Sequence, residues 1–153
     1  MSIDMSRNFQ RPEGHHVVTP AFIVPRAAKV IEFVQRAFGG EVVERYDGPN
    51  GEVFHAEVRL GDSIVMVGEP HEGGHEAMPA ALSFYVANGE AVDTIYRRAL
   101  AAGATSVAEP VNQFYGYRSA SVKDLGGNHW TICAVIEALT KEEVLRRMAG
   151  RKQ

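Results

Sequence analysis

The amino-acid sequence predicts an α+β fold in which two tandem βαβββ modules form curved mixed sheets around a cavity, followed by a C-terminal helix. Two observations predict it. The order of one strand, one helix and three strands occurs twice along the chain, and identical residues recur at a nearly constant spacing between the two halves. The expected organisation is an N-terminal arm over residues 1–16, a single domain over 17–136 with modules at 17–69 and 80–136, and a C-terminal helix and tail over 137–153.

Composition is typical of one folded domain. The 153 residues are 45% hydrophobic and 23% charged, which is close to the average for globular domains. The net charge is −3, and Lys and Arg are spread along the chain, so the basic patch that nucleic-acid binding needs is missing from the sequence. We find no signal-peptide pattern and no membrane-length apolar run. We therefore expect a cytoplasmic protein with no membrane or nucleic-acid partner, and a single cysteine, Cys133, in a structural role.

The first module begins with an apolar, strand-forming run at Val17–Val24. Apolar side chains spaced by three and four residues predict a helix over Arg26–Phe38, which Gly39-Gly40 ends. Three strands separated by turn-forming residues follow, at Glu41–Tyr46, Glu52–Leu60 and Ser63–Gly68.

The second module repeats this order, with a strand at Ala81–Val86, a helix from about Glu90 to Ala102 and three strands ending at Val135. Several identities are separated by 62 residues, and later ones by 65, which indicates a duplication with a small insertion. The matched pairs include Phe22 and Phe84, Val24 and Val86, Val30 and Val92, Arg36 and Arg98, and Leu60 and Leu125.

A final amphipathic helix is predicted over Glu137–Met148. Thr140 is placed as its N-cap, with Glu143 three residues later in a capping-box arrangement. We expect its apolar side to pack on the domain's own surface.

Several sequence blocks carry a family resemblance. Near the start are Pro12 to Pro20, Ile31-Glu32-Phe33 and Arg36 to Gly39; later come His55-Ala56-Glu57, Gly61-Asp62-Ser63, Gln113 to Gly116 with Arg118-Ser119, and Asp124 to Ile132. In this order they resemble the PhnB-like branch of the glyoxalase/bleomycin-resistance/dioxygenase superfamily, whose fold is also called vicinal oxygen chelate (VOC). The resemblance covers about residues 12–148. One departure is Leu125-Gly126, where the branch has Pro-Phe, which affects a turn.

Metal-dependent members of this superfamily carry ligands on the first and last strand of each module. The resemblance puts these positions at Thr19, Met66, Ala81 and Thr131. Thioether, methyl and neutral hydroxyl groups are poor ligands for zinc, nickel or non-haem iron. The sequence therefore predicts no metal and no other cofactor, which removes the main argument for glyoxalase, dioxygenase or epimerase chemistry.

Strand alternation predicts which side chains line the cavity, because successive residues point to opposite faces of a sheet. On the third strand Phe54, Ala56, Val58 and Leu60 should face the helix, which leaves His55, Glu57 and Arg59 on the concave side. The corresponding concave residues of the second module are Ser83, Tyr85, Tyr117, Ser119, Ser121, His129, Thr131 and Cys133. Tyr115 lies in a connection where it could close the mouth. The predicted ligand-binding residues are Thr19, His55, Glu57, Arg59, Met66, Ser83, Tyr85, Tyr115, Tyr117, His129 and Thr131.

Three roles remain open for His55 and Glu57. They could be hydrogen-bonded wall residues with Arg59 ion-paired to Glu57, they could contact a ligand, or they could act as acid and base or, with His129, as a displaced metal site. The pairs His15-His16 and His71 with His75 are interpreted as loop histidines. Gly73-Gly74 argues against a helix that would bring His71 and His75 onto one face.

These observations predict a metal-independent protein that binds an aromatic metabolite or an antibiotic. The alternative is an isomerase or lyase in which His55, Glu57 and His129 are the catalytic candidates. The sequence contains no nucleophile elbow, phosphate loop or dinucleotide fingerprint. The family resemblance also implies a homodimer in which modules from two chains complete each cavity and the arm over Met1 to Gly14 wraps the partner.

Overall fold

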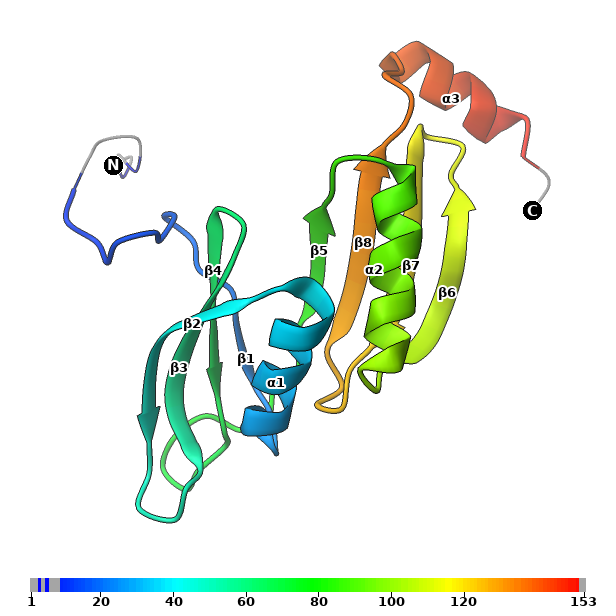
Figure 1. The fold of residues 1–153 in the computed structure, drawn as a ribbon. Coiled ribbons are helices and arrows are strands. Elements are labelled where there is room, and N and C mark those ends of the chain that lie inside the picture. The colour runs from blue at the N-terminus through cyan, green and yellow to red at the C-terminus, as the bar shows by residue number, and fades with distance from the viewer. Residues whose placement is uncertain (1–2, 4, 6–8, 152–153) are drawn as a thin grey trace.

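The computed structural model describes residues 3, 5 and 9–151. These residues form two four-stranded sheets, each with a helix against one face, and a third helix at the C-terminal end (Figure 1). The first module consists of β1 (Ala21–Ile23), α1 (Ala27–Phe38), β2 (Glu41–Asp47), β3 (Val53–Leu60) and β4 (Ser63–Gly68). The second module and the C-terminal helix are β5 (Ala81–Tyr85), α2 (Gly89–Ala101), β6 (Thr105–Asn112), β7 (Tyr117–Lys123), β8 (His129–Val135) and α3 (Lys141–Ala149).

The two sheets have the same internal order. The strands run β1-β4-β3-β2 in the first sheet and β5-β8-β7-β6 in the second. In each sheet the first strand pairs in parallel with the last strand of its module, and the other pairs are antiparallel. The predicted α+β class and the duplication of a βαβββ module are therefore confirmed. β1 is shorter than predicted, because Val17 and Val18 lie before it and are exposed.

The helix ends follow local sequence signals. Gly39 ends α1 in the left-handed region at φ 71°, which glycine adopts without a Cβ clash. The side chain of Asn88 caps α2 by accepting a hydrogen bond from the Ala91 N–H at 2.9 Å. Thr140 caps α3 in the same way, with the Glu143 N–H at 3.2 Å, as predicted.

The predicted start of the last helix at Glu137 is wrong. Because Thr140 is the N-cap, α3 begins at Lys141, and the Glu137 N–H bonds instead to the Gly116 carbonyl in the turn after β6. None of the α3 residues is buried, and Leu145 and Met148 are exposed. The expected packing of an apolar α3 face on the domain surface is therefore not observed.

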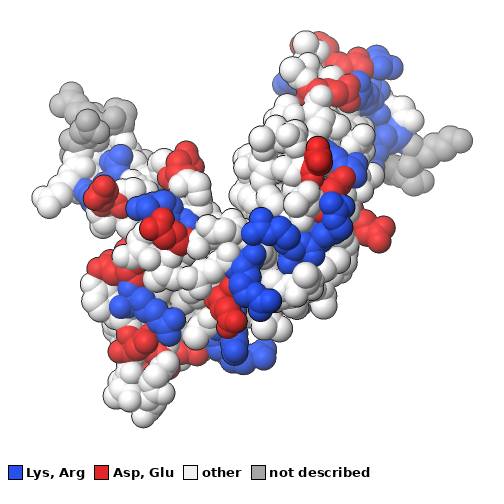
Figure 2. Space-filling view, viewed as in Figure 1, with Lys and Arg blue, Asp and Glu red and all other residues white. Residues whose placement is uncertain are grey.

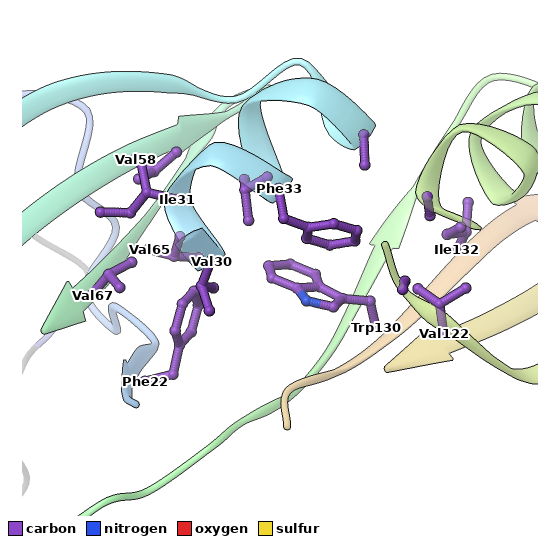
Figure 3. Close-up of a cluster of buried hydrophobic side chains, with 14 of the residues drawn as sticks. Phe22, Val30, Ile31, Phe33, Val58, Val65, Val67, Val122, Trp130 and Ile132 are labelled. Atoms are coloured by element: carbon purple, nitrogen blue, oxygen red, sulfur yellow. The ribbon is translucent and has the colours of Figure 1, made fainter. Parts of the chain in front are cut away.

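One hydrophobic core joins the two modules (Figure 3). Trp130, on β8 of the second module, is 1% exposed and contacts three aromatic rings. Its ring centre lies 5.9 Å from that of Phe22 on β1, 5.0 Å from Phe38 on α1 and 6.2 Å from Phe84 on β5. Such edge-on and tilted aromatic pairs stabilise a core beyond the area they bury. Trp130 therefore faces the helices, as the alternation of β8 predicted.

A bulge in β3 changes the predicted alternation at its first residues. Asp47 on β2 pairs with Val53 and Tyr46 pairs with His55, so Phe54 is an extra residue between two pairs. Val53 is buried in the core, whereas Phe54 is 61% exposed. The prediction that Phe54 faces the helix is therefore wrong, although Ala56 and Val58 are buried there as expected.

The modules meet mainly through α1 and α2 and appear as two lobes in Figure 2. Across this contact, Arg98 on α2 donates to the Arg36 carbonyl at 3.1 Å, and these are the two arginines matched by the 62-residue repeat. Side chains on the helix-free faces, such as Tyr46, Phe54 and Tyr85, are exposed. None of α1, α2 and α3 combines the length and apolar character that crossing a membrane requires.

Candidate ligand-binding site

The helix-free face of the first sheet places polar and apolar side chains in rows across the strands. Strand register aligns Ala21 on β1 with Met66 on β4, Met66 with Glu57 on β3, and Glu57 with Glu44 on β2. Glu57 is 7% exposed, which is unusual for a carboxylate and requires a partner.

The partner of Glu57 is His15, in the arm before β1. His15 Nε2 lies 2.6 Å from Glu57 Oε1, and its Nδ1 lies 3.3 Å from the Glu13 carbonyl. Both ring nitrogens therefore face acceptors. Either the imidazolium form or the neutral tautomer with its proton on Nε2 can donate to the Glu57 carboxylate. The contact places an imidazole and a carboxylate together on this face of the sheet.

Glu44 and Tyr46 extend the polar network along β2. The Tyr46 hydroxyl donates to the Glu44 carboxylate, and this bond raises the pKa of Tyr46 and lowers the pKa of Glu44. The rings of Tyr46 and His55 stack with centres 6.4 Å apart, and His55 Nε2 lies 3.9 Å from Glu57 Oε1. His55 is therefore beside the carboxylate, as predicted from their spacing on β3.

The predicted ion pair between Arg59 and Glu57 is wrong. Arg59 Nη1 lies 3.3 Å from Glu41 Oε2, at the end of the neighbouring strand, where the register pairs Arg59 with Glu41. Glu57 lies two residues further along β3 and bonds to the arm instead. Strand alternation placed Glu57 on the right face, but its partner depends on how the arm crosses the sheet.

A pocket of about 270 Å³ opens on this face, between the sheet and the linker after β4. Most of its lining is apolar, and its polar side chains are three histidines and one glutamate. The lining residues are Ala21, Phe22, Ile23, Phe54, His55, Met66, Val67, Gly68, Glu69, His71 and His75. Both carboxylate oxygens of Glu69 accept backbone N–H bonds, from Ala27 at 3.4 Å and from Val53 at 2.6 Å.

The sequence analysis did not identify several residues of this face, namely His15, Glu44, Tyr46, His71 and His75. Alternation along β2 could have found Glu44 and Tyr46, which are two residues apart on one face. No sequence signal places His15 or the linker histidines, because their positions depend on the path of irregular backbone. His71 and His75 are loop histidines, as interpreted, and both line the pocket.

The helix-free face of the second sheet carries hydroxyl and aromatic side chains. Register aligns Ser83 with Thr131 and Thr131 with Ser121, and the Ser121 and Thr131 hydroxyls are 3.1 Å apart. A cluster of three tyrosine rings stands beside these hydroxyls. The ring centres of Tyr85 and Tyr117 are 6.0 Å apart, and those of Tyr115 and Tyr117 are 5.2 Å apart. A side-chain hydrogen bond with Tyr117 raises the pKa of Tyr85.

The predicted site residues therefore fall into two groups on two sheets. Thr19, His55, Glu57, Arg59 and Met66 belong to the first module, and Ser83, Tyr85, Tyr115, Tyr117, His129 and Thr131 belong to the second. β3 and β8 lie in different sheets with α1 between them in Figure 1. A single chain thus does not bring His129 together with His55 and Glu57.

The four positions where the superfamily resemblance expects metal ligands carry side chains that do not suit a divalent metal. Met66 offers a thioether, Ala81 a methyl group, and the hydroxyl of Thr131 is engaged with Ser121. Thr19 lies before β1, in the first module, whereas Ala81 and Thr131 are in the second. Across residues 3, 5 and 9–151, no three His, Cys, Asp or Glu side chains are grouped as a metal site would require.

The block from Asp124 to Ile132, which contributed to the family resemblance, is structural around Asp124. The buried Asp124 carboxylate accepts bonds from the Gly126 and Asn128 backbone N–H groups, the Asn128 side chain and Trp130 Nε1. Asn128 Oδ1 in turn accepts from the Ala80 N–H at 2.9 Å, which ties the turn to the start of β5. This network orients Trp130 in the shared core.

Comparisons with known proteins agree with this architecture. TioX from Micromonospora sp. ML1 is 25% identical, with a TM-score of 0.62 over 80% of this chain and 98% of TioX. A fosfomycin resistance protein, FosX, of Listeria monocytogenes, in complex with Mn(II), has a TM-score of 0.59 at 19% identity over 85% of this chain and 94% of FosX, a likeness of fold. An uncharacterized protein of Mycobacterium bovis is 29% identical over 87% of this chain and 92% of its own length. The model of the glyoxalase/bleomycin resistance protein/dioxygenase superfamily matches residues 14–132, and the chain therefore belongs to this superfamily.

Proposed function

We propose that the protein binds a small aromatic molecule, a metabolite or an antibiotic, on the helix-free face of the first module without the help of a metal. The pocket between this face and the linker carries the proposal. Its volume of about 270 Å³ and its mostly apolar lining with a few polar groups have the character of small-molecule sites. The stacked pair of Phe54 and His71, whose ring centres are 5.8 Å apart, offers a flat aromatic wall.

We propose that a second copy of the chain completes the site. In each chain the charged and histidine-bearing face of the first sheet and the tyrosine-bearing face of the second sheet are open. Tyr85, at 64% exposed, and Phe54, at 61%, are large apolar surfaces that a partner would cover. A homodimer that places the first sheet of one chain against the second sheet of the other would surround a ligand on both sides. The arm would then sit at this interface, although part of the proposed arm over Met1 to Gly14 lies outside the described residues.

Metal independence is supported by the donors at the positions where the superfamily resemblance expects ligands. A thioether at Met66 and a methyl group at Ala81 give a hard divalent cation no suitable donor. The motif blocks around His55 and Asp124 support the PhnB-like branch. The lone, buried Cys133 agrees with a reducing, cytoplasmic compartment.

A thermal-shift screen with planar aromatic antibiotics and quinone-like metabolites tests the binding proposal, because a ligand of the folded state raises its apparent stability. We expect a hit that shifts the native protein but not a Phe54→Asp variant, in which a charge replaces the aromatic wall. Tyr115→Asp, in the turn between β6 and β7 of the second module, is the matched comparison and should weaken the same hit if two chains enclose the ligand. A complete absence of hits would contradict the proposal.

Two further measurements test its other parts. Elemental analysis of protein purified without chelators should find no stoichiometric zinc, nickel, iron or manganese, and a stoichiometric metal would overturn metal independence. Light scattering after size-exclusion chromatography should give twice the 16.7 kDa mass of one chain. A particle of one-chain mass would overturn the dimer.

The second candidate is a metal-independent isomerase or lyase, and the grouping of His15 and His55 around the Glu57 carboxylate favours it. General acid–base catalysis needs a proton held within hydrogen-bond reach of a bound substrate. Glu57 is the candidate base, with His55 at 3.9 Å as the adjacent proton carrier, and His129 would join them only from a partner chain. If a screening hit is chemically converted, Glu57→Gln should stop conversion while binding persists. Recovery of every hit unchanged would exclude this candidate.

A further inference from the structure

The polar side chains that line the pocket are three histidines and one glutamate. Of its four polar lining residues, Glu69 has both carboxylate oxygens occupied by backbone N–H groups. The side chains left to meet a ligand's polar group are the imidazoles of His55, His71 and His75. The lining contains no lysine, arginine or aspartate. A bound molecule therefore has to match an apolar wall and a set of imidazoles.

His71 is held in place by its surroundings. Its ring stacks on Phe54 with an interplanar angle of 25°. The ring also lies close to Gly74, where a Cβ would overlap the imidazole in its present position. His71 Nδ1 lies 3.3 Å from the Glu72 carbonyl, and the tautomer with its proton on Nδ1 donates to that oxygen. The ring therefore has three close neighbours.

The protonation of Nδ1 determines what the opposite nitrogen of His71 can do. In the neutral tautomer that donates from Nδ1 to the Glu72 carbonyl, Nε2 accepts, whereas in the imidazolium form Nε2 also donates. An oxyanion at the pocket would therefore favour the protonated ring and gain a charge-assisted hydrogen bond. A carboxylate suits this site because its two oxygens can accept from more than one imidazole.

We propose that the ligands of this pocket are aromatic carboxylates, with the ring against Phe54 and Met66 and the carboxylate toward His55, His71 and His75. This inference rests on the proposed binding function and names its ligand class. The carboxylates near these histidines are Glu57 and Glu44 beside His55, Glu69 in the pocket wall, and Glu72 and Glu76 in the linker. Tyr46 stacks on His55 from β2. These acidic groups compete with a ligand carboxylate for the same imidazoles.

The test compares 2-naphthoate with the neutral isostere 2-naphthamide by ligand-observed NMR titration of the full chain. At pH 6 we expect naphthoate to bind at least about tenfold more tightly, which is the effect of one hydrogen bond to a charged group.

Variants connect the preference to the linker histidines. In His71→Phe combined with His75→Gln, the aromatic stack on Phe54 is kept but two of the three imidazoles are lost, and the preference should fall below about threefold. His16→Gln is the control, because the His16 ring bonds to the Asp62 carbonyl outside the pocket. Both exchanged linker residues are exposed, so the fold should persist, which a melting curve checks.

The outcomes separate the two proposals. Equal affinity for naphthoate and naphthamide, or a preference unchanged in the double variant, would overturn the carboxylate inference and leave aromatic binding standing. Failure of both probes to bind, together with an empty aromatic screen, would overturn the binding function and this inference with it.

Discussion

His15 in the arm and Glu57 in the centre of β3 are 42 positions apart in sequence and 2.6 Å apart in space, between Nε2 and Oε1. The side chains are 8% and 9% exposed. The contact fixes the arm across the open face of the first sheet, beside the pocket. It also supplies an imidazole partner for the buried Glu57 carboxylate, whose other polar neighbours are Glu44 and His55.

We predict that His15→Ala lowers the free energy of unfolding by about 1–3 kcal/mol, because the Glu57 carboxylate then stays buried without its partner. His16→Ala is the matched control. The exposed His16 ring bonds to the Asp62 carbonyl in the turn between β3 and β4, so its loss should change the free energy of unfolding by less than about 0.5 kcal/mol. Urea denaturation measures both. A glutamate-specific protease should also cleave after Glu13 faster in His15→Ala. Equal stability of the two variants would show that the contact does not hold the arm.

Asp124→Ala should cost at least about 3 kcal/mol, because it leaves Trp130 Nε1 and the Asn128 amide buried without an acceptor. Asp62→Ala, in the turn between β3 and β4, is the comparison. Its carboxylate bonds to the adjacent Ser63 hydroxyl at an exposed position, so the change should stay within about 0.5 kcal/mol. Trp130 is the single tryptophan, and its fluorescence reports unfolding and any loosening of the native core. A native-like emission with unchanged stability in Asp124→Ala would contradict the assigned role.

Gly116→Ala should destabilise the protein more than Gly51→Ala. Both glycines have positive φ, 93° and 83°, so the backbone penalty of about 1–2 kcal/mol applies to each. A Cβ at Gly116 would also lie 2.6 Å from the Glu137 carbonyl oxygen, whereas nothing lies within 4 Å at Gly51. We expect an additional loss of about 1–3 kcal/mol for Gly116→Ala. Thermal unfolding of the two variants measures the difference. Equal midpoints would mean that the Glu137 backbone moves away from the new Cβ without loss of stability.

Burial raises the pKa of the Cys133 thiol above its ordinary value of 9.0. Below pH 9.0 the thiol is protonated in both folded and unfolded chains and contributes no pH dependence. As pH rises past 9.0, the unfolded chain loses the proton first, so this group lowers the stability of the folded state. Reaction of the native protein with DTNB should show a midpoint above pH 9.0, and the guanidinium-unfolded chain should titrate near 9.0. Native and unfolded midpoints that coincide would refute the burial effect.

Local sequence was sufficient for most of the secondary structure. Spacing of apolar residues located α1 and α2 to within one residue at each end. Thr140 was identified as a cap, because a cap is a bond between a side chain and backbone three residues away. The repeat predicted the module order, since equal modules bury equivalent residues. Alternation also placed Ala56, Val58, Trp130 and Ile132 in the core.

Alternation failed where a strand gained a residue. The bulge at Phe54 shifts the side chains on its N-terminal side to the opposite face, which buries Val53 and brings Phe54 to the pocket. The bulge arises from the way β2 and β3 pair, and the hydrophobic pattern of neither strand by itself shows it.

The sequence by itself determined the two modules, their strand and helix order, and the face on which Glu57 and Thr131 lie, because periodicity and capping act over a few residues. Tertiary structure decided which of these side chains meet. It paired Glu57 with His15 instead of Arg59, brought His71 onto Phe54, and put His55 and His129 on separate sheets. The physical reason is that these contacts depend on the paths of the arm and the linker and on the packing of α1 against α2, which no local pattern records.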